Sequence, residues 1–262
     1  MDYSNIRLEI DNGLARLTLA RPKAANAIDL TTAAELADAA IRCDEDPQIR
    51  AVLITAEGKL FCAGGDVVSF GASLDELPSL LKRLTTDLHA AISRLMRGDA
   101  PVIVAVSGTA AGAGFSLAMA GDIVLAAESA KFTMAYTGIG LSPDGSSSWF
   151  LPRIIGTRRT AELMLTNRVL TATEAADWGL VTRTVPNDEL ATTAQGIARC
   201  LAEGPTKAYG TVKRLLAGSL QESLETQMEA EARGIAAMAA TSDGRDGVQA
   251  FLDKRKPTFK GS

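Results

Sequence analysis

The sequence has few of the residues that form disulfides or hold metal ions. Its 262 residues include three cysteines and one histidine, and no two cysteines form a C-x-x-C motif. An odd number of widely spaced cysteines predicts neither a disulfide framework nor a zinc site. Unpaired cysteines are typical of reducing compartments. We therefore expect a cytoplasmic protein without a bound metal.

The sequence also has no excess of positive charge. Lys and Arg number 27 against 31 Asp and Glu, which gives a net charge of −4. Nucleic-acid-binding proteins and membrane-binding surfaces are typically basic. No apolar run reaches the length of a membrane span, and residues 1–10 lack the apolar core of a signal peptide. We expect no nucleic-acid partner, no membrane partner and no leader peptide.

Short strands are indicated at regular points in the first half of the chain. Residues 6–10 and 14–19 alternate apolar and polar side chains around Asp11-Asn12-Gly13. This pattern predicts a β-hairpin. Residues 51–55 and 102–106 are short runs rich in β-branched side chains, which predicts buried strands.

Helices are indicated between these strands and throughout the end of the chain. Asp29 or Thr31 can cap a helix that runs to about Cys43, and residues 171–174 carry the capping signature of a short helix. A helix near Trp149 is expected to break at Gly156, before another helix at residues 160–166. Leucines recur at helical spacing from Leu74 to Leu95, a stripe expected to face the core, and the pattern from Pro186 to Leu252 is helical. Breaks in that last pattern are expected at residues 203–205, 218–219 and 242–244. The fold class is therefore α/β, with a body to about residue 200 and a helical C-terminal region.

Two turns of small residues each follow a predicted strand. The first is Phe61–Asp66, FCAGGD, and the second is Ser107–Phe115, SGTAAGAGF. A strand-turn-helix arrangement directs free backbone N–H groups at whatever lies over the helix N-terminus. Two such turns can each offer one N–H to a single oxygen, which is how an oxyanion hole is built. Glycines alone more often permit tight turns, and neither turn matches a nucleotide-phosphate motif.

The two turns in this order make the chain resemble the crotonase (enoyl-CoA hydratase/isomerase) superfamily. The resemblance extends from RPKAANAI, residues 21–28, to FLDKRKPTF, residues 251–259. It implies a spiral of β-β-α units with a helical C-terminal region. It also implies an acyl-CoA-binding core, residues 1–200, and an oligomerisation region, residues 201–262, in a homotrimer or homohexamer. The only cofactor implied is the coenzyme A of the substrate.

The resemblance assigns the two oxyanion-hole N–H groups to Gly65 and Ala113. The second position is usually glycine in the family, so the Cβ of Ala113 would narrow the pocket there. Eight further positions are implied to contact the substrate or its CoA group: Lys23, Ala24, Ala63, Asp66, Ser116, Tyr136, Phe251 and Lys254. A plain surface loop at Lys23, a helix cap at Asp66 and a basic helix end at Lys254 are the structural alternatives.

The catalytic acids of the family are only partly present. Enoyl-CoA hydratases of the superfamily use two glutamates, and those positions carry Ser116 and Tyr136 here. In several isomerases of the superfamily the catalytic acid lies in an I-G-L-x-P-D segment, which here ends at Asp144. We expect Asp144 to move a proton between carbons of an enoyl-CoA, within walls formed by Phe115, Tyr136 and Trp149. The structural alternative is that Asp144 caps the helix near Trp149.

Other functions remain open at this point. The first is hydration, with a water held by Ser116 or Asp144. The second is dehalogenation, because the segment 136–181 also resembles 4-chlorobenzoyl-CoA dehalogenase, in which an aspartate at the position of Asp144 attacks the ring and a histidine at the position of His89 activates water. The third is a non-catalytic acyl-CoA-binding protein. A lone histidine on an amphipathic helix can equally be a packing residue, so the role of His89 is open.

Overall fold

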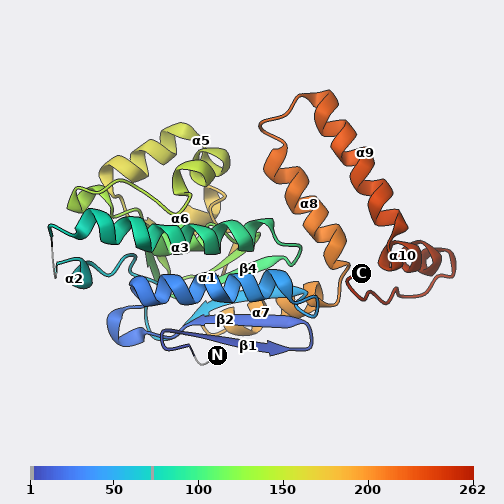
Figure 1. Cartoon of the computed structure of the whole chain (residues 1–262), viewed down its shortest axis with the longest axis horizontal. Helices are drawn as coiled ribbons and strands as arrows, with labels where there is room; N and C mark the ends of the chain where they lie inside the picture. The colour runs from blue at the N-terminus through green and yellow to red at the C-terminus, as the bar shows by residue number, and fades with distance from the viewer. Residues whose placement is uncertain (1–2, 72–73) are drawn as a thin grey trace.

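The computed structural model describes residues 3–71 and 74–262. We expect no leader peptide in residues 1–10, and of these Met1 and Asp2 lie outside the described residues. Figure 1 shows a layered body and a group of C-terminal helices that extends beside it. Among the described residues, no helix is both long and apolar enough to cross a membrane.

A six-stranded sheet is the centre of the body. The strand order is β1-β2-β3-β4-β6-β9; β1 and β2 are antiparallel, and the other neighbours are parallel. A smaller sheet has the order β5-β7-β8. The strands are β1 Ile6–Asp11, β2 Leu14–Leu19, β3 Ala51–Ala56, β4 Val102–Val106, β5 Thr109–Ala111, β6 Ile123–Ala127, β7 Lys131–Thr133, β8 Leu170–Thr171 and β9 Arg183–Val185. This sheet and the helices below confirm the expected α/β class.

The predicted hairpin is confirmed as β1 and β2. Its two central residues, Asn12 and Gly13, have φ values of 46° and 81°. Positive φ at both positions is the type I′ geometry, whose twist matches that of the paired strands. The local sequence therefore determines the register in which Leu14 faces Asp11.

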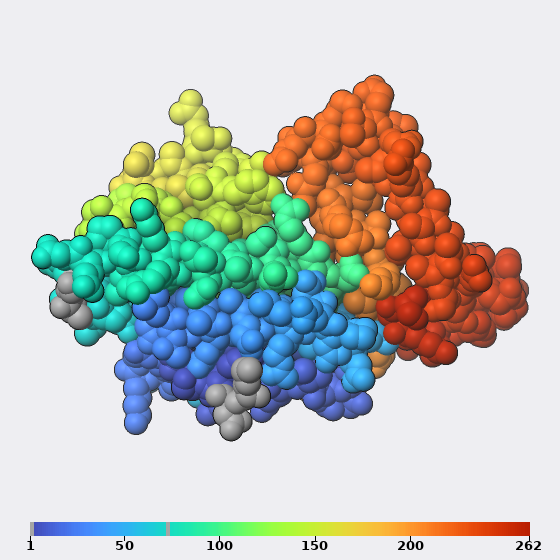
Figure 2. Space-filling view, viewed as in Figure 1, coloured from blue at the N-terminus to red at the C-terminus, as the bar shows by residue number. Residues whose placement is uncertain are grey.

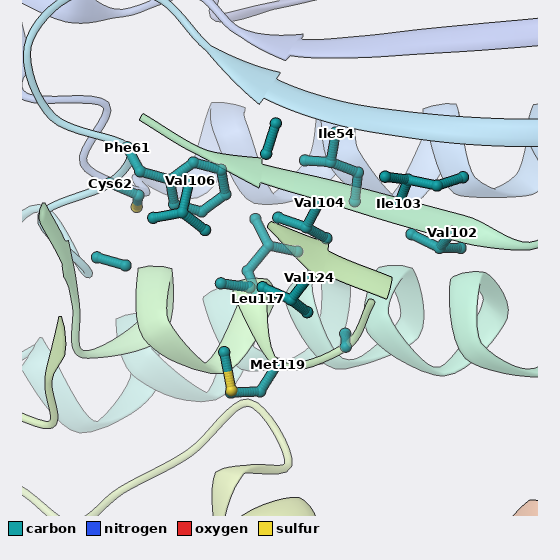
Figure 3. Close-up of a cluster of buried hydrophobic side chains, with 14 of the residues drawn as sticks. Ile54, Phe61, Cys62, Val102, Ile103, Val104, Val106, Leu117, Met119 and Val124 are labelled. Carbon is teal, nitrogen blue, oxygen red and sulfur yellow. The ribbon is translucent and has the colours of Figure 1, made fainter. Parts of the chain in front are cut away.

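The parallel strands are hydrophobic because both faces of the sheet are covered. All five residues of β4 are buried. Figure 3 shows Val104 and Val106 of β4 close to Leu117 and Val124, which follow later in the chain. Parallel strands covered on both faces are continuously apolar rather than alternating, which explains the unbroken Val102–Val106 run.

Two long helices lie side by side in the body (Figure 1). They are α1, Leu30–Glu45, and α3, Leu77–Arg97. Asp29 caps α1 through a 2.8 Å hydrogen bond from the Thr32 N–H, so Thr31 is not the cap. Leu74 lies before α3 and is 71% exposed, so the helix begins later than its leucine pattern suggested. A proline in the first turn suits this start, because it lacks an N–H that would be unpaired there.

Shorter helices lie between the strands, and α4 and α6 each connect the two sheets. Thr171 and Glu174 form the expected capping box of α6. Gly156, with φ 77° and ψ 159°, interrupts α5 where the sequence indicated a break. The shorter helices and α5 are η1 Pro22–Ala24, α2 Val67–Phe70, α4 Ala113–Ala118, η2 Thr137–Ile139, α5 Ser147–Thr166 and α6 Ala172–Asp177.

The end of the chain is helical, as expected. The helices are α7 Leu190–Ala202, α8 Thr206–Gly218, α9 Leu224–Ala240 and α10 Ser242–Leu252. Helix α7 packs against β3 and β4, whereas none of the residues of α9 is buried. The orange and red group in Figure 2 shows α8 to α10 standing out from the body. The last break lies at Thr241, which caps α10, so the break predicted at residues 242–244 is wrong by a few residues.

Candidate active site

The two glycine-containing turns lie against each other. The Cys62 carbonyl oxygen accepts a hydrogen bond from the Ala111 N–H at 2.9 Å, and the Thr109 carbonyl oxygen accepts from the Phe61 and Cys62 N–H groups at 3.1 and 3.2 Å. These bonds join the segment after β3 to β5, which precedes α4. The main chain itself therefore holds the two turns together.

Three glycines are required at this junction. Gly112 has φ 50° and ψ −125°, a conformation that side chains exclude. A Cβ on Gly64 would lie 2.9 Å from the Ala111 carbonyl oxygen, and one on Gly114 would lie 2.5 Å from the Cys62 Cβ. The turns can approach this closely only because no side chains separate them.

The close approach brings the backbone of Gly65 and Ala113 to one cavity, which both residues line. Ala113 is the first residue of α4, so its N–H has no acceptor within the helix. Among the described residues, neither the Gly65 N–H nor the Ala113 N–H has a hydrogen-bond acceptor. Two unpaired N–H groups at one cavity are what an oxyanion hole requires.

The cavity has a volume of about 360 Å³ and is mainly apolar. Its walls come from the two turns, from α2 and α3, and from the loop before α5. Besides Gly65 and Ala113, the lining comprises Ala63, Gly64, Val67, Phe70, Leu81, Lys82, Leu84, Thr85, Gly112, Ala135, Tyr136, Ile139, Leu141, Ser142 and Asp144. Asp144 is the only carboxylate in this lining.

Three hydrogen bonds fix the position of Asp144. Its Oδ1 accepts from the Tyr136 hydroxyl at 2.5 Å, and its carbonyl oxygen accepts from the hydroxyls of Ser116 and Ser147, each at 2.9 Å. The N-cap residue of α5 is Ser146, with φ 66°, and no side-chain hydrogen bond caps this helix. The alternative that the Asp144 carboxylate caps this helix is therefore wrong.

Tyr136 is held as a neutral hydrogen-bond donor. Burial raises the pKa of its phenol well above the usual value, and the negative charge of Asp144 and the hydrogen bond to it raise it further. The side chain thus keeps its proton across the physiological range. Tyr136 is both a wall of the cavity, as expected, and a partner of the carboxylate, which the sequence did not predict.

His89 lies on the other side of the carboxylate, on α3. Its Nε2 is 3.3 Å from Oδ2 of Asp144 and accepts a hydrogen bond from the Gly145 N–H at 3.1 Å. The imidazole is about half exposed, whereas the Asp144 side chain is 23% exposed. His89 is therefore a contact of Asp144 at the solvent side rather than a buried packing residue.

Asp66 supports the first turn. Its carboxylate caps α2 by accepting from the Ser69 N–H at 3.2 Å and binds Arg21 at 2.8 Å. Burial opposes its ionisation, but the Arg21 guanidinium and the N–H groups of α2 outweigh this and lower the pKa of the carboxyl. The expected cap is confirmed. Asp66 does not line the cavity, and the Arg21 contact had no recognisable sequence signal.

Other candidate residues lie outside the cavity of a single chain. Ser116 is fully buried behind Tyr136 and Asp144. Lys23 and Ala24 form η1, and Lys23 is exposed. Phe251 is 84% exposed and, like Lys254, lies at the end of α10, at the opposite end of the molecule from α2 (Figure 1).

Two of the three predicted cavity walls are wrong. Phe115 is fully buried in the core, and Trp149 packs against Phe150 outside the cavity lining. Leu81 and Leu84 also line the cavity. Leu84 belongs to the hydrophobic core and Leu81 packs against it, so the expected core stripe is confirmed. A leucine that lines a cavity and one that fills a core have the same helical spacing, so the sequence could not separate them.

Comparison with known proteins agrees with this arrangement. Residues 9–262 match the family Enoyl-CoA hydratase/isomerase. The chain is 38% identical over 253 residues to the 1,2-epoxyphenylacetyl-CoA isomerase of Escherichia coli, covering 96% of this chain and 97% of the relative. It is 36% identical over 262 residues to the crotonyl-CoA hydratase of Syntrophomonas wolfei, covering 99% of each. The relatives also include a 4-chlorobenzoyl coenzyme A dehalogenase of an Arthrobacter species.

A solved structure extends the agreement to the fold. The crystal structure of an enoyl-CoA hydratase from Polaromonas superposes with a TM-score of 0.92 at 34% identity, covering 97% of this chain and 99% of that one. The expected crotonase fold is therefore confirmed. Among the described residues, no group of three or more His, Cys, Asp or Glu side chains is placed to hold a metal ion. The chain is an enzyme of the enoyl-CoA hydratase/isomerase family, within the crotonase superfamily.

Proposed function

We propose that the enzyme moves the double bond of an enoyl-CoA by carrying a proton on Asp144. The observation that carries this proposal is that one carboxylate and two unpaired N–H groups line the same apolar cavity. A double-bond shift needs one group that takes a proton at one carbon and returns it at another. The described lining offers one such group and no second carboxylate.

In the proposed reaction, the thioester oxygen lies between the N–H groups of Gly65 and Ala113. Asp144 removes a proton from a carbon next to the double bond, and the electron pair of the C–H bond moves into a dienolate. The two N–H groups bind the negative oxygen, each contributing about 3 kcal/mol to the transition state. Asp144 then returns the proton at the far carbon, which completes the shift without gain or loss of atoms.

Hydration fits the site less well. Adding water across a double bond needs a base for the water and an acid for the carbon, and the two positions that hold glutamates in hydratases carry Ser116 and Tyr136. Tyr136 keeps its proton and Ser116 is fully buried away from the cavity. A hydratase would have to use Asp144 for both steps.

Dehalogenation is a second candidate because of one contact, the 3.3 Å separation of His89 Nε2 and Asp144 Oδ2. A carboxylate that attacks an aryl ring needs a neighbouring base to activate the water that releases the product. Incubation with 4-chlorobenzoyl-CoA distinguishes this candidate, because only a dehalogenase releases chloride.

The isomerase proposal is tested by supplying 2-enoyl-CoA and 3-enoyl-CoA separately and following the products by mass spectrometry and chromatography. A shifted double bond at constant mass supports it, whereas a gain of 18 Da in the product would indicate hydration, since that is the mass of water. Asp144→Asn should abolish the shift, and Asp177→Asn, at an exposed position of α6, should not. Tight acyl-CoA binding without turnover would indicate a non-catalytic binding protein.

We also propose that residues 1–200 form the acyl-CoA-binding core and residues 201–262 an oligomerisation region of a homotrimer or homohexamer. Large apolar side chains are exposed along α8 to α10: Val212, Leu216, Leu224, Met228, Ile235, Val248, Phe251 and Leu252. In such an assembly Phe251 and Lys254 of one subunit reach the CoA group of another, and Lys23, Ala24 and Ala63 contact the same group. A monomeric mass in analytical ultracentrifugation would contradict this.

The remaining proposal concerns location. The three cysteines are unpaired in the described structure, which agrees with a reducing compartment. We infer a cytoplasmic enzyme, which fractionation of cells that express the native chain would test.

A further inference from the structure

The two oxygens of the Asp144 carboxylate have different partners. Oδ1 accepts the Tyr136 hydroxyl proton at 2.5 Å. Oδ2 has no donor among the described residues other than the His89 ring nitrogen at 3.3 Å, whose role depends on where its proton lies. Since a hydrogen bond to a charged oxygen lowers its basicity, Oδ2 is the oxygen that takes up a proton more readily.

The Gly145 N–H determines which role His89 plays. A backbone N–H can only donate, and this one is directed at Nε2 of His89 at 3.1 Å. Nε2 therefore presents a lone pair, and a neutral ring in this geometry carries its proton on Nδ1. With Asp144 ionised, Oδ2 and Nε2 are two acceptors facing each other without a proton between them.

Protonation of Asp144 changes this contact. Once Oδ2 carries a proton, it can donate to Nε2 in an O–H···N hydrogen bond that the ionised carboxylate could not make. The half-exposed imidazole then connects Oδ2 of the less exposed Asp144 with solvent. We propose that His89 is the exchange partner through which the proton held by Asp144 equilibrates with water, an inference that depends on the proposed proton-transfer function.

The exchange balances without an added reactant. The substrate proton moves from carbon to Oδ2, and its bonding electrons remain in the dienolate. From Oδ2 the proton either returns to carbon or passes to Nε2, giving an imidazolium and an ionised Asp144. The imidazolium releases one proton to water and accepts another by the reverse steps. A solvent-derived proton can thus reach the product carbon.

The inference is tested by running the reaction in D₂O and measuring deuterium in the product per double-bond shift at early conversion. Wild-type protein should incorporate solvent deuterium. In His89→Gln the amide oxygen can accept from Gly145 but cannot pass a proton on, so deuterium per shift should fall several-fold while the shift itself continues. His89→Leu should behave in the same way, and Ser93→Ala, one turn further on an exposed position of α3, should match wild type.

A merely structural role for His89 would lower turnover without changing deuterium per shift, and that result would overturn the inference. Absence of deuterium from the wild-type product would also overturn it. If wild type shows no double-bond shift, the proposed function fails separately. In that case deuterium exchange at the α-carbon of a saturated acyl-CoA, which needs only Asp144 and the two N–H groups, still compares wild type with His89→Gln, and equal rates would refute the exchange role.

Discussion

The hydroxyl group of Tyr136 donates its proton to Oδ1 of Asp144 over 2.5 Å. The Ser116 hydroxyl donates to the Asp144 carbonyl oxygen at 2.9 Å and lies 3.2 Å from the Tyr136 oxygen. Ser116 belongs to α4, the helix whose first N–H is that of Ala113. The proposed base and one proposed oxyanion donor are therefore connected through partly buried hydrogen bonds.

Tyr136→Phe should lower kcat/KM about tenfold or more, since a hydrogen bond to a charged group contributes roughly 1.5–3 kcal/mol. Steady-state kinetics with an enoyl-CoA substrate measures this loss.

Tyr209→Phe is the matched control for this variant. The Tyr209 hydroxyl makes no side-chain hydrogen bond to the described residues, and α8 lies away from the cavity. Its kinetics should equal those of wild type. A normal rate in Tyr136→Phe would show that the phenol does not position Asp144.

Gly114→Ala should disrupt the junction of the two turns. A Cβ there would lie 2.5 Å from both the Cβ and the carbonyl oxygen of Cys62, and backbone cannot yield easily. We expect a loss of roughly 1–3 kcal/mol in the free energy of unfolding, typical of overpacking, together with weaker acyl-CoA binding. Gly196→Ala in α7, where nothing lies within 4 Å of the added Cβ, should be neutral or stabilising. Chemical denaturation of both variants checks the difference, and equal stabilities would contradict it.

Local signals in the sequence predicted most of the secondary structure. Asn12-Gly13 indicated the hairpin, Asp29 and Thr171 indicated helix starts, and each is confirmed by its backbone geometry. These features depend on residues within a few positions of one another. The resemblance to the family then supplied the spiral of β-β-α units and the candidate site residues, which local patterns do not contain.

Local sequence patterns could not predict contacts between distant residues, although the resemblance to the dehalogenase already placed His89 and Asp144 in one reaction. His89 and Asp144 are 55 positions apart, and Arg21 and Asp66 are 45 apart. Neither pair has a characteristic spacing, because tertiary packing alone brings them together. The sequence also could not show that Leu81 lines the cavity, since a leucine that lines a cavity and one that is buried in a core have the same apolar side chain.

Asp66 should make stability depend on pH in the acid range. Its folded-state pKa lies below the ordinary value of 3.8, despite burial, because of Arg21 and the N–H groups of α2. A lowered folded pKa contributes stability at pH values above the unfolded value, and this contribution is lost as the pH falls through the folded value. Asp66→Asn should therefore be less stable than wild type at pH 7, and the difference should shrink below about pH 4. Thermal unfolding at pH 7 and below about pH 4 measures the difference in stability between the two proteins. A difference that does not change with pH would exclude the Arg21–Asp66 pair as its source.

Lys213 should attach α8 to the body. Its side chain is 7% exposed, and its ammonium binds Asp122 at 2.9 Å and the carbonyl oxygens of Leu95 and Ala100 at 3.0 and 2.9 Å. Lys213→Met removes this donor from the two carbonyl oxygens and leaves the Asp122 carboxylate with the Val102 N–H at 2.8 Å but no cation. This should cost about 3 kcal/mol in the free energy of unfolding, since breaking a buried pair is strongly destabilising.

Lys207→Met provides the control on the same helix. Lys207 is 52% exposed, and its bond to Asp99 is 3.0 Å long. An exposed pair of this kind contributes no more than about 1 kcal/mol, so denaturant unfolding should separate the two lysines clearly. Amide hydrogen exchange locates the effect: protection in α8 should fall in Lys213→Met while protection in β4 remains. Equal losses in the two variants, or equal protection in α8, would show that the buried lysine does not attach this helix.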